Sequence, residues 1–431
     1  MSSAMRHALC AKRQGYAVWA ATLLFLVLGI LTPARGQESV QMSIASAQAA
    51  EARHRAATTV GYYNLKLGPT AWNFGMGMGV DYNSNVNNTE SNPEADFIIR
   101  PQINTRMLWP VSELNSINLA LGLGYSAYVK TPNNDRAFIT PGSELSFDLY
   151  VGDFWINLHD RFSISENTYQ NPSVAGSGNY SQFQNALGVA TTCDLNKAIV
   201  QAGYDHLNYD SLNGNNQNSG GQQSGYSEVL STSAGYKLKP GMLLGVELGD
   251  SLINYTTTTA SYPSANQWNL GGFYDTPVSE YIHFTIHAGY TMYTPQSSGA
   301  TTGSTNFGGM YAELDITHRL NQYMSYSLSG GRTLTTTLGS GAIEQYFVRW
   351  GANWQIVRKV SLGTTFSYAN GTDLYVGGET YDQYGPGISL NRTITQKLSS
   401  SLGYQVYWRT SNQANRNYTV NVVSLNLNYT F

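Results

Sequence analysis

The chain of 431 residues has a formal net charge of −3 at pH 7, and 12% of its residues are charged, about half the usual globular share. The acidic balance excludes a nucleic-acid-binding protein, which needs a basic surface, and two cysteines exclude a disulfide framework. Abundant tyrosine (31) and glycine (43) instead suit strands with one face in lipid and the other in water.

Residues 16–32 form an uncharged, mostly apolar run that basic residues precede and small residues follow. This order is typical of an export signal, so we predict a signal peptide over residues 1–36 that is cleaved after Gly36, with Ala47 or Ala49 as alternative cleavage sites. A membrane anchor is the competing interpretation, because about 17 residues is the short limit of a transmembrane helix. The predicted leader holds four basic residues and no acidic one, so its removal changes the formal charge from −3 to −7.

Residues 37–70 begin with a stretch rich in Gln, Ala and Ser, and we predict that they form a short periplasmic tail. From residue 71 onward the chain repeats one unit, which consists of a strand, a short turn, a second strand and a long polar loop. Apolar residues alternate along each strand, so one face of the sheet is apolar. The strands have about 9–14 residues, a length that crosses a membrane when the strand is tilted.

Short connections such as residues 151–153 alternate along the chain with long ones such as residues 166–179. This alternation is typical of outer-membrane barrels. We therefore predict an all-β fold over residues 71–431, a transmembrane antiparallel β-barrel of about eighteen strands, with 16 or 20 as the alternatives if one hairpin is miscounted. The polar segment 211–225 is predicted to be an external loop, and folding of this loop into the pore is the alternative.

The last strand, residues 421–431, places apolar side chains at every second position and ends on an aromatic residue. The pattern resembles the C-terminal signature that the barrel assembly machinery of the bacterial outer membrane reads, and we predict Phe431, Tyr429 and Leu427 as the assembly signal. We expect this strand to pair with residues 71–83, because closure removes both edges of the sheet. An edge strand of a soluble β-protein is the alternative.

Charged residues on the face opposite the apolar one are candidates for the lining of the lumen. There they would set the electric field and the diameter that a solute meets; the alternative is that they pair with one another to hold the barrel shape. The candidates are Arg100, Arg106, Lys130, Glu144, Asp148, His159, Arg161, Lys237, Glu247, His283, His287, Glu313, Asp315, Arg319, Glu344, Arg349, Lys397 and Arg409.

Four ionisable residues fall on the apolar face instead, where a charge at the lipid midplane costs about 2–4 kcal/mol. They are Asp160, His206, Asp250 and Arg332. A β-bulge would shift the phase of the strand, and we expect one at Asp160 and at Asp250. A position near the membrane interface is the alternative.

The sequence offers little for catalysis or metal binding. His283 and His287 are possible metal ligands by residue type. A spacing of four residues along a strand separates them by about 13 Å, however, so one ion cannot bridge them. No G-x-S-x-G motif marks a catalytic serine, and no phosphate-binding or dinucleotide-binding loop has its strand–helix context. We predict a protein that is not an enzyme and binds no cofactor and no metal.

Residues 64–86, NLKLGPTAWNFGMGMGVDYNSNV, resemble the opening of the β-barrel porin type 2 family: a strand rich in Gly and apolar residues, then an aromatic, polar and Asn-Val step into the first loop. Family members usually carry an acidic residue where this chain has Ser84. With the repeated hairpins and Phe431, the similarity spans residues 64–431. The resemblance implies a porin-like role, sometimes linked to export of surface polysaccharide, and no catalytic residues.

These observations predict a passive channel in the bacterial outer membrane for small polar solutes or ions. Its expected partners are outer-membrane lipid, the barrel assembly machinery and the solutes themselves, and nucleic acid is excluded. The alternative is a barrel that does not conduct, or that a partner gates, in polysaccharide export or envelope structure. The sequence leaves the solute, the ion selectivity and the oligomeric state open.

Overall fold

The computed structural model describes residues 63–165, 181–212, 224–256, 264–296, 306–337, 341–374 and 378–431. The predicted signal peptide, most of the predicted tail and most of the segment 211–225 lie outside the described residues. No helix in the described part of the chain is long and apolar enough to cross a membrane.

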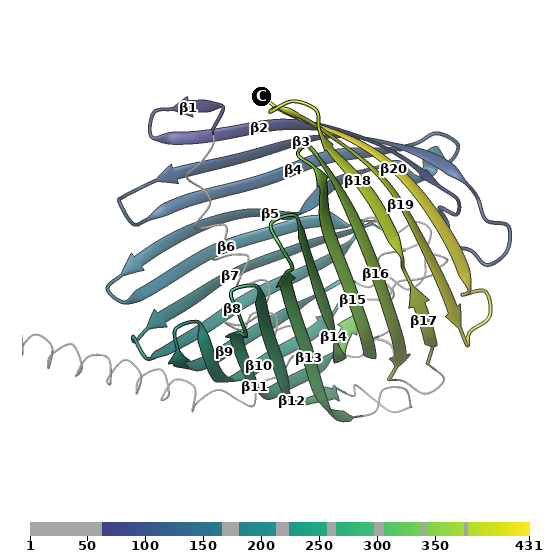
Figure 1. Cartoon of the computed structure of the whole chain (residues 1–431). Helices are drawn as coiled ribbons and strands as arrows, with labels where there is room; N and C mark the ends of the chain where they lie inside the picture. Colours follow the sequence, from purple (N-terminus) through teal and green to yellow (C-terminus); the bar gives the residue numbers. More distant parts are fainter. Residues whose placement is uncertain are drawn as a thin grey trace, which may run out of the picture. The chain divides into compact units, whose positions relative to one another are not determined.

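The described residues form one antiparallel sheet of twenty strands (Figure 1). In chain order the elements are β1 (Leu65–Leu67), β2 (Thr70–Asn83), β3 (Asp96–Pro110), β4 (Ser116–Tyr128), the 3₁₀ helix η1 (Pro132–Asn134), β5 (Arg136–Val151), β6 (Phe154–Ser165), β7 (Gln182–Asp194), β8 (Ala198–Ser211), β9 (Gly225–Lys239), β10 (Met242–Tyr255), β11 (Ala265–Pro277), β12 (Ile282–Pro295), β13 (Phe307–Arg319), β14 (Met324–Thr337), β15 (Gly341–Val357), β16 (Val360–Asp373), β17 (Thr380–Tyr384), β18 (Gly387–Thr393), β19 (Leu398–Ser411) and β20 (Tyr418–Thr430).

Eighteen of these units run from one end of the barrel wall to the other, and each is called a crossing. The short strand β1 only extends β2 as a hairpin, within the last part of the predicted tail. β17 and β18 are two halves of one crossing, because β16 and β19 each pair with both. The break between the halves falls at Gly385-Pro386, where proline has no N–H to donate to the ladder. The predicted barrel of eighteen strands is confirmed.

The sheet closes on itself where the last strand meets the first long one. β20 pairs with β2 from Gly75 opposite Thr430 to Asn83 opposite Val422, and the two strands lie side by side in Figure 1. The backbone N–H of Phe431 donates a further bond to the Phe74 carbonyl at 3.1 Å. The expected pairing of the terminal strand with residues 71–83 is therefore confirmed, and it leaves neither strand as an open edge.

Connections at one end of the barrel contain two to five residues, as between β5 and β6 or β9 and β10. We call this the short-turn end. The other end carries most of the longer connections, such as residues 84–95 and 166–181, and we call it the long-loop end. The two ends match the predicted alternation of turns and loops, which an outer-membrane barrel places in the periplasm and outside the cell respectively.

The two faces of the wall differ in polarity as the sequence pattern predicts. Apolar side chains on the outer face are exposed, for example Ile103 at 62% and Met310 at 75%. Side chains on the inner face converge, so residues from strands that are not neighbours can meet there. The Tyr311 hydroxyl of β13, for example, donates to the Glu247 carboxylate of β10 at 2.8 Å. Outer apolar and inner polar faces are what a membrane barrel requires.

The bulges do not lie where the sequence analysis expects them. Strand pairing is regular through Asp160 and through Asp250, so the prediction of a bulge at either residue is wrong. Both side chains stay on the outer face, and the Asp160 carboxylate accepts a hydrogen bond from the Asn185 amide. A clear bulge lies instead in β5, where the register shifts between Ile139 and Ser143.

Candidate channel lining

Most charged side chains on the inner face are held in pairs across neighbouring or next-nearest strands. Arg100 of β3 contacts Asp81 of β2 at 2.6 Å, and Arg161 of β6 contacts Glu144 of β5 at 3.2 Å. Near the short-turn end, the Lys237 ammonium lies 2.7 Å from the Asp194 carboxylate. Because each pair cancels its own charge locally, these residues shape the wall more than they set a long-range field.

The wall formed by β10 to β13 carries a buried polar cluster. The Glu247 carboxylate lies 3.0 Å from the His287 Nδ1 and accepts a bond from the Tyr311 hydroxyl at 2.8 Å. Each of the three side chains is at most about 4% exposed. Phe273 packs beside the imidazole ring, with its centroid 6.0 Å away. Satisfied hydrogen bonds offset the cost of burying these polar groups.

A second buried pair lies between β6 and β8. The His159 Nε2 is 2.7 Å from the Asp205 Oδ1, and its Nδ1 is 2.8 Å from the Asn157 amide oxygen. Asn157 is oriented in turn by its donation to the Asp148 carboxylate at 2.8 Å. Both imidazole nitrogens therefore face oxygen atoms. The sequence analysis found Asp148 and His159 but missed Asp205, although it follows the same period of two along β8.

At the long-loop end, Glu379 joins two arginines. Its carboxylate lies 2.9 Å from the Arg409 guanidinium and 2.9 Å from the Arg416 guanidinium. Arg409 also stacks over the Tyr381 ring at 3.7 Å and is 2% exposed. Burial alone would raise the pKa of the Glu379 carboxyl, but the two guanidinium groups and the Ser411 hydroxyl outweigh burial and lower it. This cluster ties the connection after β16 to the ends of β19 and β20.

The wall formed by β2, β3, β4 and β20 has a different inner surface, in which glycine alternates with polar residues. Four polar side chains of β3 lie on the inner face, and inner-face glycines of β2 and β4 stand opposite most of them. Two asparagines of β20 face the glycines of β2 from the other side. The polar residues are Arg100, Gln102, Asn104, Arg106, Asn426 and Asn428, and the glycines are Gly75, Gly77, Gly79, Gly122 and Gly124. We call this region the glycine wall.

The glycines are required because neighbouring side chains lie over them. A Cβ atom at Gly77 would come within 2.7 Å of the Gln102 side chain and within 2.9 Å of the Asn428 amide oxygen. A Cβ atom at Gly122 would come within 2.0 Å of the Thr140 hydroxyl. The glycine wall therefore lets amide side chains lie close to the backbone, which leaves room above them in the lumen.

Ten of the candidate residues lie on the inner face, opposite the exposed apolar side chains. They are Asp148, His159, Glu247, His283, His287, Glu313, Asp315, Arg319, Arg349 and Arg409. Lys130 and Lys397 lie outside the strands, so their interpretation as strand residues of the lining is wrong. Lys130 sits in the connection after β4, and its backbone N–H donates to the Asp96 carboxylate at 2.9 Å.

The prediction that Glu344 lines the lumen is also wrong, because its side chain faces outward. Its carboxylate pairs with Arg332 at 2.7 Å, and Arg332 is one of the four residues that the sequence places on the apolar face. His206 is paired in the same way, with Glu228 at 2.9 Å. These pairs lie three to five residues from the long-loop ends of their strands. Outer charges are therefore tolerated by pairing near the interface, where their cost falls.

The predicted assembly signal lies on the outer face of β20 and just beyond it. Phe431 is 44% exposed, Leu427 is 42% exposed and Tyr429 is 37% exposed. The Phe431 ring packs edge-on against the Tyr429 ring with centroids 5.3 Å apart. All three side chains are thus available to lipid or to a protein that binds the outer surface, and their role as a signal stays a prediction.

The two histidines of β12 have separate carboxylate partners. His283 lies 2.6 Å from Asp275, whereas His287 contacts Glu247. Among the described residues, no group of three or more His, Cys, Asp or Glu side chains has a geometry that could hold a metal ion.

Solved structures with a similar fold include OpdQ of Pseudomonas aeruginosa, with a TM-score of 0.50, 10% identity, and coverage of 85% of this chain and 99% of that one. OccAB3 of Acinetobacter baumannii has a TM-score of 0.49, 10% identity, and coverage of 85% and 100%. A BenF-like porin from Pseudomonas fluorescens has a TM-score of 0.49, 8% identity, and coverage of 85% and 100%. At these identities, the likeness to OpdQ establishes the fold alone.

No curated protein sequence matches the chain. The sequence profile of the family described as "Putative beta-barrel porin 2" matches residues 73–431, from the start of the barrel wall to the last residue. The match covers well over half of the chain and agrees with the closed barrel of eighteen crossings. The chain therefore belongs to the beta-barrel porin 2 family, and it is a porin-like β-barrel of the bacterial outer membrane.

Proposed function

We propose that the barrel is a passive channel through which small polar solutes or ions diffuse across the outer membrane. The observation that carries this proposal is a closed wall of eighteen crossings whose inner face is polar and whose outer face is apolar. Barrels of about 16–18 strands leave an aqueous channel. A polar inner face gives such a channel a surface that water wets and that solutes can follow.

The arrangement of charge supports a filter with weak ion selectivity. Arg100, Arg161 and Lys237 each have an acidic partner within 3.2 Å, so their fields are largely cancelled. A strongly selective pore would instead carry a ring of like charges without partners. Selectivity in this channel would then depend on the few inner charges that have no ion pair.

The outer surface supports the remaining partners. Exposed apolar side chains of the strands would contact lipid, and Phe431, Tyr429 and Leu427 would be read by the assembly machinery. We assign no catalytic role to the chain.

Reconstitution of the purified protein in planar lipid bilayers tests the proposal. In KCl we expect stepwise increases in current as single barrels insert, with a reversal potential near zero in a salt gradient. Protein denatured by boiling serves as the control, and a shift of its band on a gel reports that the barrel was folded before heating. If the folded protein gives no current steps at any voltage, the channel is refuted in favour of a barrel that is closed or gated by a partner.

A further inference from the structure

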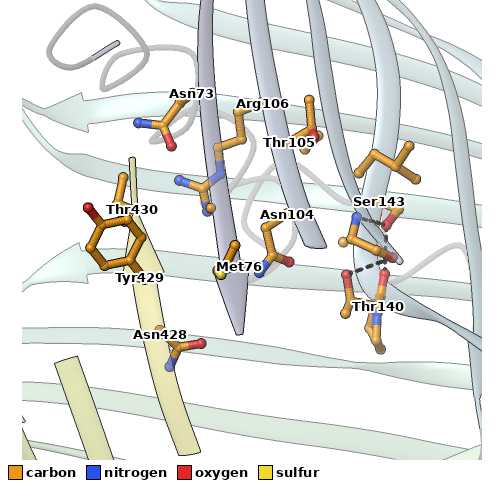
Figure 2. Close-up of a pocket in the computed structure, with 16 residues that line it drawn as sticks. Asn73, Met76, Asn104, Thr105, Arg106, Thr140, Ser143, Asn428, Tyr429 and Thr430 are labelled. Atoms are coloured by element: carbon orange, nitrogen blue, oxygen red, sulfur yellow. Dashed lines mark hydrogen bonds between the residues drawn. The ribbon is translucent and has the colours of Figure 1, made fainter. Parts of the chain in front are cut away.

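The glycine wall contains a recess on its lumen side. The recess has a volume of about 390 Å³ and is formed by β2, β3, β4, β5 and β20. Figure 2 shows the Arg106 side chain in the middle, with Asn73 and Asn104 close by, Asn428 on β20 to one side, and Thr140 on β5 to the other. Ligand pockets of proteins start at about 300 Å³, so the recess is large enough for a small solute.

Two features of the backbone create the recess. Gly75 and Gly122 stand opposite Asn104 on its two neighbouring strands, so neither position adds a side chain of its own to the recess. On β5 the bulge near Gly142, whose φ of +88° favours glycine, moves the strand out of register. The bulge is held by the Ser143 hydroxyl, which accepts the Gly122 N–H at 3.1 Å and donates to the Thr140 carbonyl at 2.9 Å. Bulges commonly re-aim side chains next to functional sites.

Arg106 differs from the other arginine on the inner face of β3. Arg100 is paired with Asp81 at 2.6 Å, whereas the Arg106 side chain is exposed and makes no ion pair or hydrogen bond with any residue that the structure describes. Glu144 of β5 is the acid that register brings to this part of the wall, through Ala120 of β4. Its carboxylate is already engaged with Arg161 at 3.2 Å. The Arg106 guanidinium therefore stays available to a molecule in the recess that its side chain lines.

We propose that the recess binds a small organic carboxylate that also carries hydroxyl groups. The planar Arg106 guanidinium matches a carboxylate with two parallel hydrogen bonds. The amides of Asn73, Asn104 and Asn428 each supply a donor and an acceptor, which is what a hydroxyl group requires. None of the described residues that line the recess is acidic, so none of them would repel the anion. The inference rests on the proposed channel, because it names the class of solute that the inner wall favours.

Calorimetric titration of the full-length barrel in detergent, with sodium gluconate as the probe, tests the inference. We expect gluconate to bind the unaltered protein in the millimolar range, and sorbitol, which lacks the carboxylate, to bind at least tenfold more weakly. Arg106→Gln should weaken gluconate binding about tenfold or more, because a bidentate charged contact is lost. Arg106→Lys should fall between the two, since it keeps the charge but not the planar fork.

Arg358→Gln is the matched control, because it removes the same charge from the turn between β15 and β16 at the short-turn end. It should leave gluconate affinity within a factor of two. Equal losses in Arg106→Gln and Arg358→Gln, or equal binding of gluconate and sorbitol, would overturn the inference. Bilayer currents of the same samples in KCl separate this result from the proposed function. Current steps without gluconate binding would refute only the proposed carboxylate site. Gluconate binding without current steps would refute only the proposed channel.

Discussion

The glycine wall and the wall that holds Glu247 line the same barrel but use their inner faces in opposite ways. On β10 to β13, Glu247, His287 and Tyr311 meet across strands and bury one another. On β3, Asn104 stands between two glycines and Arg106 stands between Asn73 and Ala120, so the Arg106 guanidinium stays open to the lumen. Inner charges therefore have two roles: some hold the wall together, and others remain available to a solute.

This contrast explains why position along the period of two does not by itself identify a channel lining. Glu247 and Arg106 both alternate with apolar outer residues, and the pattern gives them the same weight. What separates them is whether a side chain reaches them across the inner face. The Tyr311 hydroxyl of β13 reaches Glu247 of β10 over Gly271, whereas no described side chain forms an ion pair or hydrogen bond with the Arg106 guanidinium. Partners from strands that are not adjacent therefore decide whether a charge is paired or open.

The largest expected effect comes from breaking the buried cluster. Glu247→Ala removes the acceptor of both His287 and Tyr311, and leaving buried polar groups without partners costs about 3 kcal/mol. We expect the free energy of unfolding to fall by about that amount, measured by urea titration of the barrel in lipid vesicles with tryptophan fluorescence as the readout. Gluconate binding at the recess should not change.

The double variant Glu247→Ala, His287→Ala is the control for this experiment. If the cluster is a coupled unit, the second substitution should cost much less than it does alone, because His287 has already lost its partner. Additive losses would show that Glu247 acts independently of the imidazole and would contradict the buried pair.

The next effect is a pH dependence at the long-loop end. The pKa of Glu379 lies below its ordinary value of 4.5, because the attraction of Arg409 and Arg416 outweighs burial. A lowered pKa gives stability that is fully present above 4.5 and is lost as the pH falls through the folded value. We expect Glu379→Gln to lower the free energy of unfolding by about 2 kcal/mol at pH 7, and by progressively less as the pH is lowered towards 3.

Urea titrations at pH 7, 5 and 3 check this prediction. A constant difference between the two proteins at all three pH values would mean that the Glu379 charge contributes nothing and that only its packing matters. Asp153→Asn, in the turn between β5 and β6, is a suitable control because it removes a carboxylate at the opposite end of the barrel.

Filling the glycine wall should have a smaller but more local effect. At Gly122 a methyl group would lie 2.0 Å from the Thr140 hydroxyl, so Gly122→Ala forces the β5 bulge to shift at a cost of about 1 kcal/mol. The same substitution should reduce gluconate binding several-fold by narrowing the recess. Calorimetry and urea titration on one sample measure both effects.

Gly351→Ala on β15 is the matched control, because a Cβ atom there would meet only the Ser327 hydroxyl at an ordinary 3.6 Å. It should change neither the free energy of unfolding nor gluconate binding by a measurable amount. Equal effects of the two substitutions would mean that glycine in this sheet is needed for backbone freedom rather than for space.

The fold was predictable because its signals are local. Alternating polarity determines the face of each strand, and the contrast of short turns with long loops determines their number. The predicted connections 151–153 and 166–179, for example, enclose the segment 154–165, which is the extent of β6. The site was less predictable because it depends on contacts between strands. Asp205 and Glu379 acquire their roles only from His159 and Arg409, and the bulge in β5 arises beside Gly122 of another strand.

The smallest effect on stability is expected at Phe431, at the end of the strand that closes the barrel by pairing with β2. Its side chain is 44% exposed on the outer face, so Phe431→Ser should change the free energy of unfolding by less than about 1 kcal/mol. If the terminal aromatic is read by the assembly machinery, the same variant should instead appear several-fold more slowly in the membrane, measured as heat-modifiable barrel after a pulse of synthesis.

Phe366→Ser controls for the loss of lipid-facing surface, because Phe366 is an outer aromatic residue of β16 that is 37% exposed. Equal rates for the two variants would mean that Phe431 contributes only apolar bulk, and a delay confined to Phe431→Ser would show that assembly depends on its position at the closing strand.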